Sequence, residues 1–193
     1  MEISTQQIKE LRELTGISIM QCRKALEEAG GDREKALVIL RKKGGEAVGK
    51  KADRTLAAGS VHSYIHSNGN IGAMIELKCE TDFVSKNPEF KALAYEIAMH
   101  VAATNPEYLK IEDIPADAKA TAREVFEKDL AGKPKNMHEN ILEGKLSSYF
   151  NERVLLMQPF IKDADKTIAN LLEAGVQKFG EKIEITRFVR FSI

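Results

Sequence analysis

The 193-residue chain is short of the features that mark several classes of protein. It has no tryptophan, and only 6% of its residues are aromatic. Lysine plus arginine equals aspartate plus glutamate at 29 each, and this zero net charge argues against a broad nucleic-acid or membrane surface, though not against a local basic patch. The chain lacks an apolar run of membrane-spanning length, and its N-terminus lacks a basic-then-apolar signal segment. We therefore expect a cytoplasmic protein with no membrane partner.

Cysteine and glycine are placed in ways that argue against two kinds of site. The two cysteines, Cys22 and Cys79, match no metal or redox motif, and both fall at apolar positions of predicted secondary structure, so we expect buried thiols. The glycine pairs Gly30-Gly31 and Gly44-Gly45 lack the Lys-Ser/Thr ending of a phosphate-binding loop. We expect no nucleotide to bind this chain directly.

Side chains that could carry chemistry are isolated from one another. His62 and His66 are four residues apart, but a strand holds that spacing far apart, and no acidic residue or cysteine follows nearby as a further metal ligand. No serine or cysteine stands beside a histidine in a known nucleophile motif. We expect no enzymatic activity, no bound metal and no cofactor.

Residues 1–43 predict a small module of three short helices. Capping residues at Ser4, Ser18 and Asp32 mark the starts of these helices. The first helix carries one apolar stripe at helical spacing, formed by Ile8, Leu11 and Leu14. Three helices of this size enclose only a thin core.

The rest of the chain divides into a linker and a larger unit. Residues 44–57 hold three glycines and several basic residues, and they predict a flexible or partly helical linker. Residues 58–193 predict an α+β core, in which a small antiparallel sheet is covered by helices. Helices are expected from Pro88 to Asn105, from Ile114 to Leu130, from about Asn136 to Leu155 and from Thr167 to Lys178, with a break at Gly132-Lys133-Pro134 and a strand-like tail over 183–191.

Two registers are open for the predicted hairpin of residues 58–80. A two-residue Asn-Gly turn directs His62 and Tyr64 toward the apolar face. A three-residue loop slips the pairing by one residue and directs Val61 and Ile65 there instead. We prefer the second register, because it gathers the apolar side chains of both strands on one face.

The run Cys79-Glu80-Thr81-Asp82-Phe83-Val84 places an acidic residue and a large aromatic on a turn that leaves the sheet. A turn does not bury Phe83 as easily as a strand interior does. An exposed ring beside a charge is a candidate anchor for a partner's pocket. The alternative, in which Phe83 folds back onto its own core, stays open from the residues alone.

This run contains the ETDFV signature of the bacterial translation elongation factor Ts family, and the chain resembles the short members of that family over nearly its whole length. Further motifs stand in family-like order and spacing: Thr15-Gly16, Met20 to Leu26, Tyr64 to His66, Ala98 to Ala102, Gly132 to Pro134 and Gln158 to Phe160. The resemblance implies a ubiquitin-associated-like three-helix domain at residues 1–43 and a dimerisation core at residues 58–193.

The resemblance also implies a guanine-nucleotide exchange factor that binds the GTPase elongation factor Tu. The implied partner-binding residues are Thr81, Asp82, Phe83 and Val84 in the turn, and Met20 and Arg23 in the N-terminal module. The turn would press between two helices of the GTPase and shift the elements that hold the nucleotide's Mg²⁺, so that GDP leaves. From residue types alone, the favoured interpretation of Arg23 is one of many solvated helix charges, and only the resemblance points to a contact.

Longer family members carry a duplicated core and an inserted coiled coil, whereas this chain has room for one core copy. We therefore predict a homodimer through the sheet and the C-terminal tail, and a two-plus-two complex with the GTPase. The alternative from another class is an adaptor without exchange activity that binds a protein, the ribosome or RNA. It rests on the basic residues Lys42, Lys43, Lys50, Lys51 and Arg54.

Overall fold

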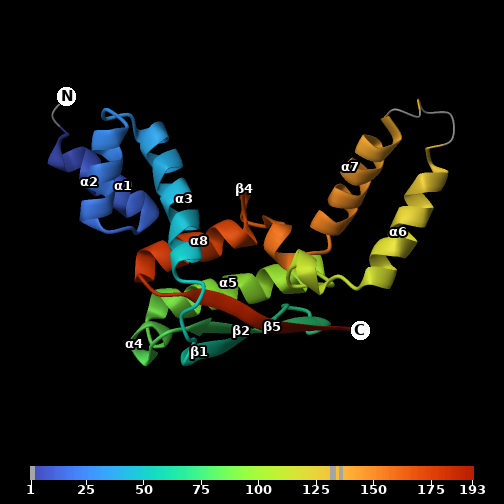
Figure 1. Ribbon diagram of the computed structural model, residues 1–193. Helices are drawn as coiled ribbons and strands as arrows, with labels where there is room; N and C mark the ends of the chain where they lie inside the picture. The colour runs from blue at the N-terminus through green and yellow to red at the C-terminus, as the bar shows by residue number, and fades with distance from the viewer. Residues whose placement is uncertain (1–2, 131–133, 135–136) are drawn as a thin grey trace.

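The computed structural model describes residues 3–130, 134 and 137–193 and confirms the predicted α+β class (Figure 1). A three-helix module, a sheet with its covering helices and a projecting helical hairpin follow one another along the chain. The elements are α1 (Thr5–Thr15), α2 (Ile19–Glu28), α3 (Arg33–Lys50), β1 (Ala58–Ile65), β2 (Ile71–Cys79), α4 (Asp82–Ser85), α5 (Pro88–Thr104), η1 (Ile111–Asp113), α6 (Ala116–Lys128), α7 (His138–Asn151), η3 (Leu155–Met157), β3 (Pro159–Phe160), β4 (Asp163–Thr167), α8 (Ile168–Phe179) and β5 (Ile183–Ser192).

The N-terminal module packs α1, α2 and α3 around a small core of its own. Ser4, Ser18 and Asp32 cap the three helices, because each side-chain oxygen accepts a backbone N–H of the first turn. The buried side chains are Leu11, Ile17, Cys22, Ala25, Leu26, Ala36 and Leu40. Leu14, which the sequence placed on the buried stripe, is exposed instead and borders a groove between the module and α8.

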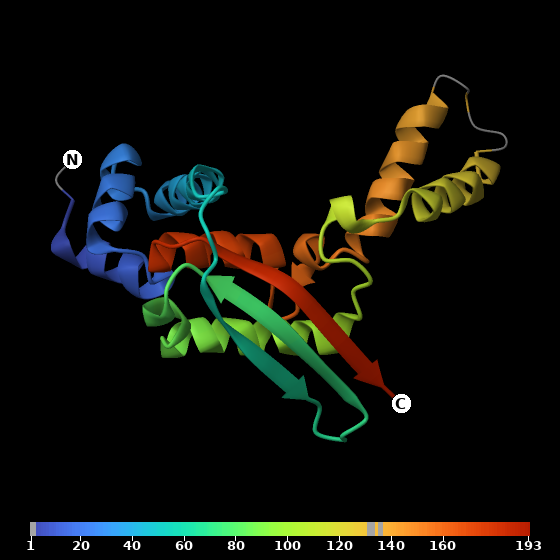
Figure 2. The same cartoon turned by 60° about the horizontal axis from the view of Figure 1, so that its bottom comes forward.

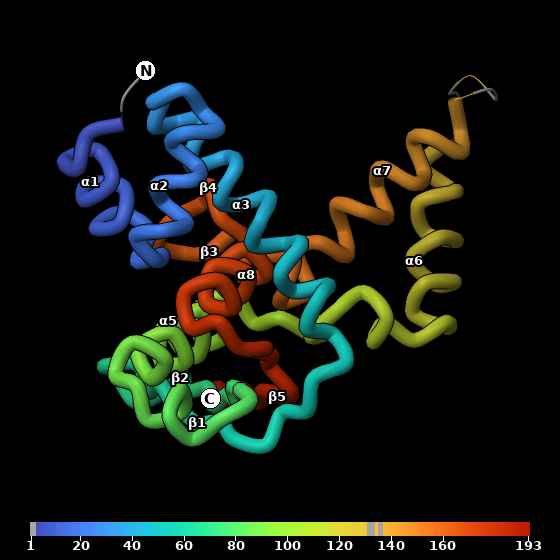
Figure 3. Tube along the Cα trace, turned by 60° about the vertical axis from the view of Figure 1, so that its left-hand side comes forward, coloured from blue at the N-terminus to red at the C-terminus, as the bar shows by residue number. Residues whose placement is uncertain are grey.

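α3 continues past the predicted end of the module and runs to Lys50, so the predicted linker begins as helix. Glycine ordinarily weakens a helix interior. Here α3 lies against α8 (Figure 3), and a Cβ on Gly44 would lie 3.4 Å from Gln177 Oε1, which is an ordinary contact distance. Packing on α8 therefore extends a helix that its own composition would not.

The sheet is antiparallel with strand order β1-β2-β5 (Figure 2). α5 lies across one face, and α8 packs on the same side (Figure 1). The largest fully buried side chains between these layers are Ile75, Leu77, Phe90, Ile97, Leu155, Ile168 and Ile185. The opposite face, which we call the outer sheet face, carries the exposed side chains of Val61, Ile65, Met74, Val189 and Phe191.

The hairpin adopts the register that we did not prefer. Tyr64 pairs with Ala73, one residue away from the preferred pairing. His62 and Tyr64 therefore face α5, and Val61 and Ile65 face outward, so our assignment of the β1 faces was wrong. The assignment of the β2 faces was right, because Ala73 lies in the core.

Local turn geometry and one aromatic pair account for this register. His66 N donates to Ile71 O at 2.8 Å, and Gly69, at φ 74°, donates its N–H back to His66 O at 2.8 Å. The positive φ favours glycine at this position. On the inner face Tyr64 packs edge-on against Tyr95 of α5, with ring centroids 5.8 Å apart.

α6 and α7 form a helical hairpin that projects from the body (Figure 1). Ala122 of α6, Leu142 of α7 and Leu130 just past α6 are buried, and Arg123 donates two hydrogen bonds to the carboxylate of Glu139 at 3.0 and 3.1 Å. The predicted break at Gly132-Lys133-Pro134 and the predicted helix start near Asn136 lie outside the described residues, apart from Pro134.

His100 of α5 is fully buried within the core layer. Its Nδ1 accepts a hydrogen bond from Ile161 N at 3.4 Å, so its Nε2 donates to Gln158 Oε1 at 2.9 Å. Burial lowers the pKa of His100, and the hydrogen bond with Gln158 offsets only part of that shift. At neutral pH the imidazole is therefore uncharged in the folded chain.

We expect the free energy of unfolding to decrease as the pH is lowered from 7 to 5. The unfolded chain, in which His100 has a pKa near 6.5, takes up the proton first, so the stabilisation present above that pH is lost below it. Glu80 and Asp82, whose pKa values are lowered, lose their contributions only at more acidic pH. Urea unfolding at both pH values measures the effect. An equally steep dependence in His100→Gln would assign it to another group.

Candidate partner-binding surface

Thr81 begins a single helical turn at the point where the chain leaves β2. It is the N-cap of α4, in an extended backbone conformation, and its hydroxyl accepts the N–H of Val84 at 3.5 Å. Asn87 then caps α5 through Glu89 N at 2.8 Å, with Pro88 at the first helical position. Two successive helix starts therefore fix the backbone on both sides of the turn.

The turn directs one apolar side chain outward and the next inward. Phe83 is 81% exposed, whereas Val84 is 4% exposed and belongs to the core. The alternative in which Phe83 folds back onto its own core is thereby contradicted for the free chain. Val84, which we expected among the partner-contacting residues, is not accessible and instead anchors the turn.

Asp82 lies beside the ring, at the first position of α4. Its carboxylate forms an ion pair with Lys86, with Oδ2 and Nζ 2.6 Å apart, and this hydrogen bond lowers the pKa of Asp82. Both side chains are largely exposed, and exposed pairs contribute little to stability. Breaking the pair with Lys86 therefore costs little free energy, and the Asp82 carboxylate is available to pair with a group of a partner.

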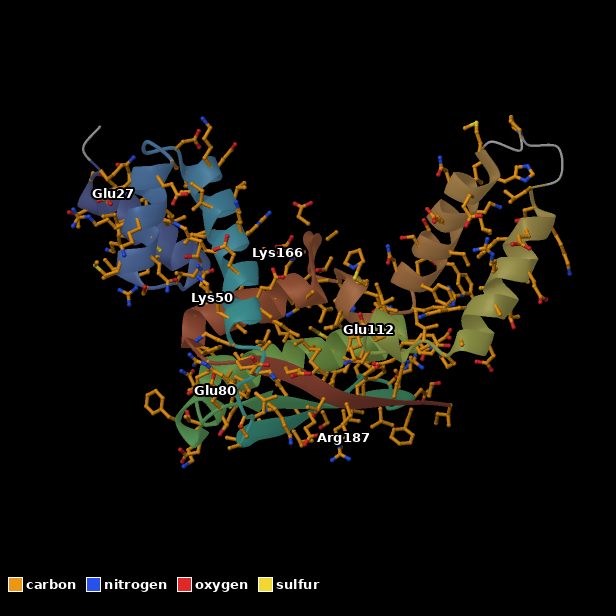
Figure 4. All side chains as sticks on the ribbon, in the orientation of Figure 1. Glu27, Lys50, Glu80, Glu112, Lys166 and Arg187 are labelled. Atoms are coloured by element: carbon orange, nitrogen blue, oxygen red, sulfur yellow. The ribbon has the colours of Figure 1, made fainter. Side chains whose placement is uncertain are left out.

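The base of the turn is held by two carboxylates. Glu181, in the loop between α8 and β5, accepts hydrogen bonds from the backbone N–H groups of Glu80 and Thr81, each at 3.0 Å, and from the Thr81 hydroxyl at 2.5 Å. Glu80 accepts Lys182 N at 2.6 Å and pairs with Arg54 at 3.1 Å. Figure 4 shows Glu80 at the α4 end of the sheet. Sequence reasoning missed Glu181, because about a hundred residues separate it from the turn.

Both cysteines are free and buried, as predicted. Cys79 ends β2 directly before the turn, and its thiol donates to Thr81 O at 3.2 Å. Burial raises the pKa of Cys79 to about 11, with the Glu181 carboxylate adding to the shift. A thiol with this pKa is protonated and unreactive at neutral pH, so it acts here as a packing residue.

The N-terminal module presents Met20 and Arg23 on α2. Met20 is exposed, and Arg23, with 59% of its side chain exposed, forms an ion pair with Glu27 at 2.8 Å. Leu14 of α1 and Ile19, the first residue of α2, are also exposed, and sequence reasoning proposed neither as a partner contact. The sequence could have indicated that Ile19 is exposed, because it directly follows the N-cap Ser18 and a residue at that position need not face the core.

These two groups of residues lie on separate bodies at one end of the molecule. α2 belongs to the module and α4 to the sheet layer, and Figures 1 and 2 both place them toward the end opposite the α6–α7 hairpin. The arrangement offers one protruding ring and one exposed helix face to a large partner. It does not bring Met20 or Arg23 into the turn itself.

The basic residues behind the adaptor alternative are partly engaged within the chain. Lys43 pairs with Glu28 at 2.5 Å, Lys51 donates to Gly180 O at 2.8 Å, and Arg54 pairs with Glu80. Lys50 lies near the end of α3 (Figure 4). Three of the five charges thus serve tertiary contacts, which weakens the case for a continuous RNA-binding patch.

Within the part of the chain that the structure describes, every helix is too short or too polar to span a membrane. In that same part of the chain, no group of three or more histidine, cysteine, aspartate and glutamate side chains is arranged to hold a metal ion.

Known sequences similar to this one span its whole length. A family profile described as elongation factor TS matches residues 5–193. A protein named elongation factor Ts from Thermodesulfovibrio yellowstonii is 50% identical and aligns over 100% of this chain and 97% of its own. Those of Carboxydothermus hydrogenoformans and Thermotoga maritima are 49% and 47% identical, and the alignments cover 89% and 97% of those proteins. The similarity therefore includes the module, the sheet and the hairpin.

Proposed function

Because this chain belongs to the elongation factor Ts family, and is therefore a translation elongation factor, we propose that it is a guanine-nucleotide exchange factor that binds elongation factor Tu and promotes the release of GDP. Its contact residues are Asp82 and Phe83 on the turn and Met20 and Arg23 on α2, with Thr81 as the cap of the turn. The observation that carries the proposal is the 81% exposure of Phe83 on a turn fixed from beneath.

Phe83 enters a gap between two helices of the GTPase, and Asp82 exchanges Lys86 for groups of the partner. Insertion displaces the elements that hold the nucleotide's Mg²⁺. Without the cation, the phosphates of GDP repel one another and the nearby carboxylates, and GDP leaves. This chain contributes only binding energy, so no nucleophile or base is required of it.

Thermodynamic linkage sets the size of the effect. The factor weakens GDP binding by the same ratio by which GDP weakens the binding of the factor. Each tenfold change needs about 1.4 kcal/mol of differential contact. Burial of one phenylalanine side chain supplies roughly 1.5–3 kcal/mol, which is one or two factors of ten. Larger acceleration requires Asp82 and the N-terminal module as well.

The active form in this proposal is a homodimer that binds two GTPases. The outer sheet face supports it, because Ile65 of β1 and Phe191 of β5 flank Gly72 of β2 on the same side, and Val189 pairs with Met74 beside them. These side chains are exposed in the single chain. A contiguous apolar face of this kind commonly marks a protein–protein contact.

Release of fluorescent GDP from purified elongation factor Tu, with and without this protein, tests the proposal. We expect catalytic acceleration, in which a substoichiometric amount of the factor allows excess unlabelled GDP to replace all of the fluorescent GDP. Unchanged release would contradict the proposal. If RNA binding with a steep salt dependence accompanied that result, the adaptor alternative would replace it.

Arg23→Ala is expected to weaken association with the GTPase by about tenfold, while GDP release from the saturated complex changes less. The guanidinium is exposed and its pair with Glu27 is readily exchanged for a partner carboxylate. Titration of GDP-release rate against factor concentration separates the two quantities. Lys9→Ala, which removes another exposed positive charge of the module, serves as the control. Equal affinities of Arg23→Ala and the parent would remove Arg23 from the contact surface.

A further inference from the structure

The loop between α8 and β5 binds the turn more extensively than any feature of the local sequence predicts. One carboxylate, that of Glu181, accepts both consecutive N–H groups at the end of β2 and the hydroxyl of Thr81. The neighbouring Lys182 N donates to Glu80 Oε1 at 2.6 Å. The loop thus fixes Glu80 and Thr81 from outside their own strand.

The same loop also binds the segment that follows α3. Lys51 Nζ donates to Gly180 O at 2.8 Å, and Lys182 Nζ donates to Ala52 O at 2.7 Å. Arg54 completes the connection by binding Glu80. Residues 180–182 therefore join the end of the N-terminal module to the base of the Phe83 turn.

We propose that Glu181 is a positioning residue that holds the Thr81–Phe83 turn in its partner-binding conformation before the partner arrives. The inference rests on the proposed function, and it deepens it by assigning the rigidity of the turn to one side chain. Three hydrogen bonds from Glu80 and Thr81 converge on this one side chain, so it fixes the backbone of two consecutive residues. On the core side Val84 and Ser85 are buried, and the Cys79 thiol donates to Thr81 O. None of these contacts engages the N–H groups of Glu80 and Thr81, so loss of Glu181 leaves the Thr81 end free to sample other conformations.

Preorganisation of the turn affects the affinity for the partner. A flexible turn must be ordered when the partner binds, and this ordering costs free energy, so a turn that is not preorganised binds more weakly. Once bound, the turn adopts the same conformation and Phe83 makes the same contacts. Removal of Glu181 therefore raises the concentration of factor needed for half-maximal GDP release and leaves the maximal rate largely intact. A residue that contacted the GTPase in the act of release would lower the maximal rate.

Three variants test the proposal. Glu181→Ala removes all three bonds, whereas Glu181→Gln keeps the shape, because its oxygen accepts the two N–H groups and its amide donates to the Thr81 hydroxyl. Glu96→Ala is the matched control, since Glu96 also pairs across elements, with Lys162 at 3.0 Å, but lies on α5. If Glu181→Ala lowers Tm markedly, Thr81→Val takes its place. It removes one of the three bonds to Glu181 together with the long cap bond from Val84 N at 3.5 Å.

Hydrogen exchange of the free protein reads the conformation of the turn without the GTPase. Glu181→Ala is expected to lower protection of the Glu80 and Thr81 amides by about tenfold, while Glu181→Gln and Glu96→Ala stay within about twofold of the parent. Unchanged protection in Glu181→Ala would overturn the positioning role. This measurement does not require the parent protein to promote GDP release. Failure of the positioning role can therefore be distinguished from failure of the proposed function.

GDP-release titrations then read the consequence for the partner. The half-saturating concentration should rise about tenfold in Glu181→Ala, equivalent to about 1.4 kcal/mol, and return near the parent value in Glu181→Gln. In a double-mutant cycle, Glu181→Ala should have little further effect on affinity once Phe83 is alanine. Additive effects of the two substitutions, or a loss confined to the maximal rate, would overturn the inference.

Discussion

Phe83→Ala should slow GDP release from elongation factor Tu by roughly tenfold to a hundredfold without destabilising the protein. The ring is 81% exposed in the free chain, so its removal leaves no cavity, and the unfolding free energy should stay within about 0.5 kcal/mol of the parent. The whole loss falls on the contact with the partner. Stopped-flow release of labelled GDP and urea unfolding measure the two quantities separately.

Two controls frame this result. Phe90→Ala removes a fully buried ring of α5 and is expected to lower stability by about 3–5 kcal/mol. Val125→Ala truncates an exposed apolar side chain on α6 and should leave both quantities unchanged. If Phe83→Ala promoted GDP release from the GTPase at the parent rate, the turn would not be the element that opens the nucleotide site. A large stability loss would place the ring in the protein's own core in solution.

Phe191→Asp should abolish dimer formation at micromolar concentration and preserve the fold of each chain. Phe191 is 69% exposed on the outer sheet face, so a carboxylate there is solvated in the monomer. In a symmetric dimer the change occurs twice, and burying two charges at an apolar contact costs at least about 4 kcal/mol. The dimer dissociation constant should therefore rise by about a thousandfold or more.

Sedimentation velocity over a concentration series measures this change. Val38→Asp, which places the same charge at an exposed position of α3, is the matched control and should remain dimeric. If the parent protein were monomeric at micromolar concentration and still promoted GDP release at full rate, the proposal of an active homodimer would be refuted. A dimeric Phe191→Asp protein would move the contact away from the outer sheet face.

Much of the fold and of the site could be predicted from the sequence because the deciding interactions are local. Ser4, Ser18 and Asp32 cap helices through bonds to residues within the next turn. The alternation along β2 gave the correct buried face, since Met74 is exposed between the buried Ala73 and Ile75. The turn after β2 was located by its acidic and aromatic pair, flanked by a strand and an Asn-Pro helix start.

The burial of individual side chains was less predictable. Leu14 lies on the apolar stripe of α1 yet is exposed, and Val84 belongs to the predicted partner-binding motif yet is buried. An apolar side chain favours burial, but it is buried only where another element of the fold packs against it. For the same reason Val61 and Ile65 were assigned to the wrong face of β1, where Tyr64 packs against Tyr95 instead.

The sequence by itself determined most of the longer elements, the caps of α1, α2 and α3 and the presence of an aromatic on a turn, because these depend on contacts among residues a few positions apart. Only the tertiary structure decided the face of β1, the length of α3 and the hydrogen bonds from Glu181 to Thr81. Each of these depends on an element distant along the chain that comes close only when the sheet and α8 have packed. The order of residues along the chain does not show which of these distant elements come into contact.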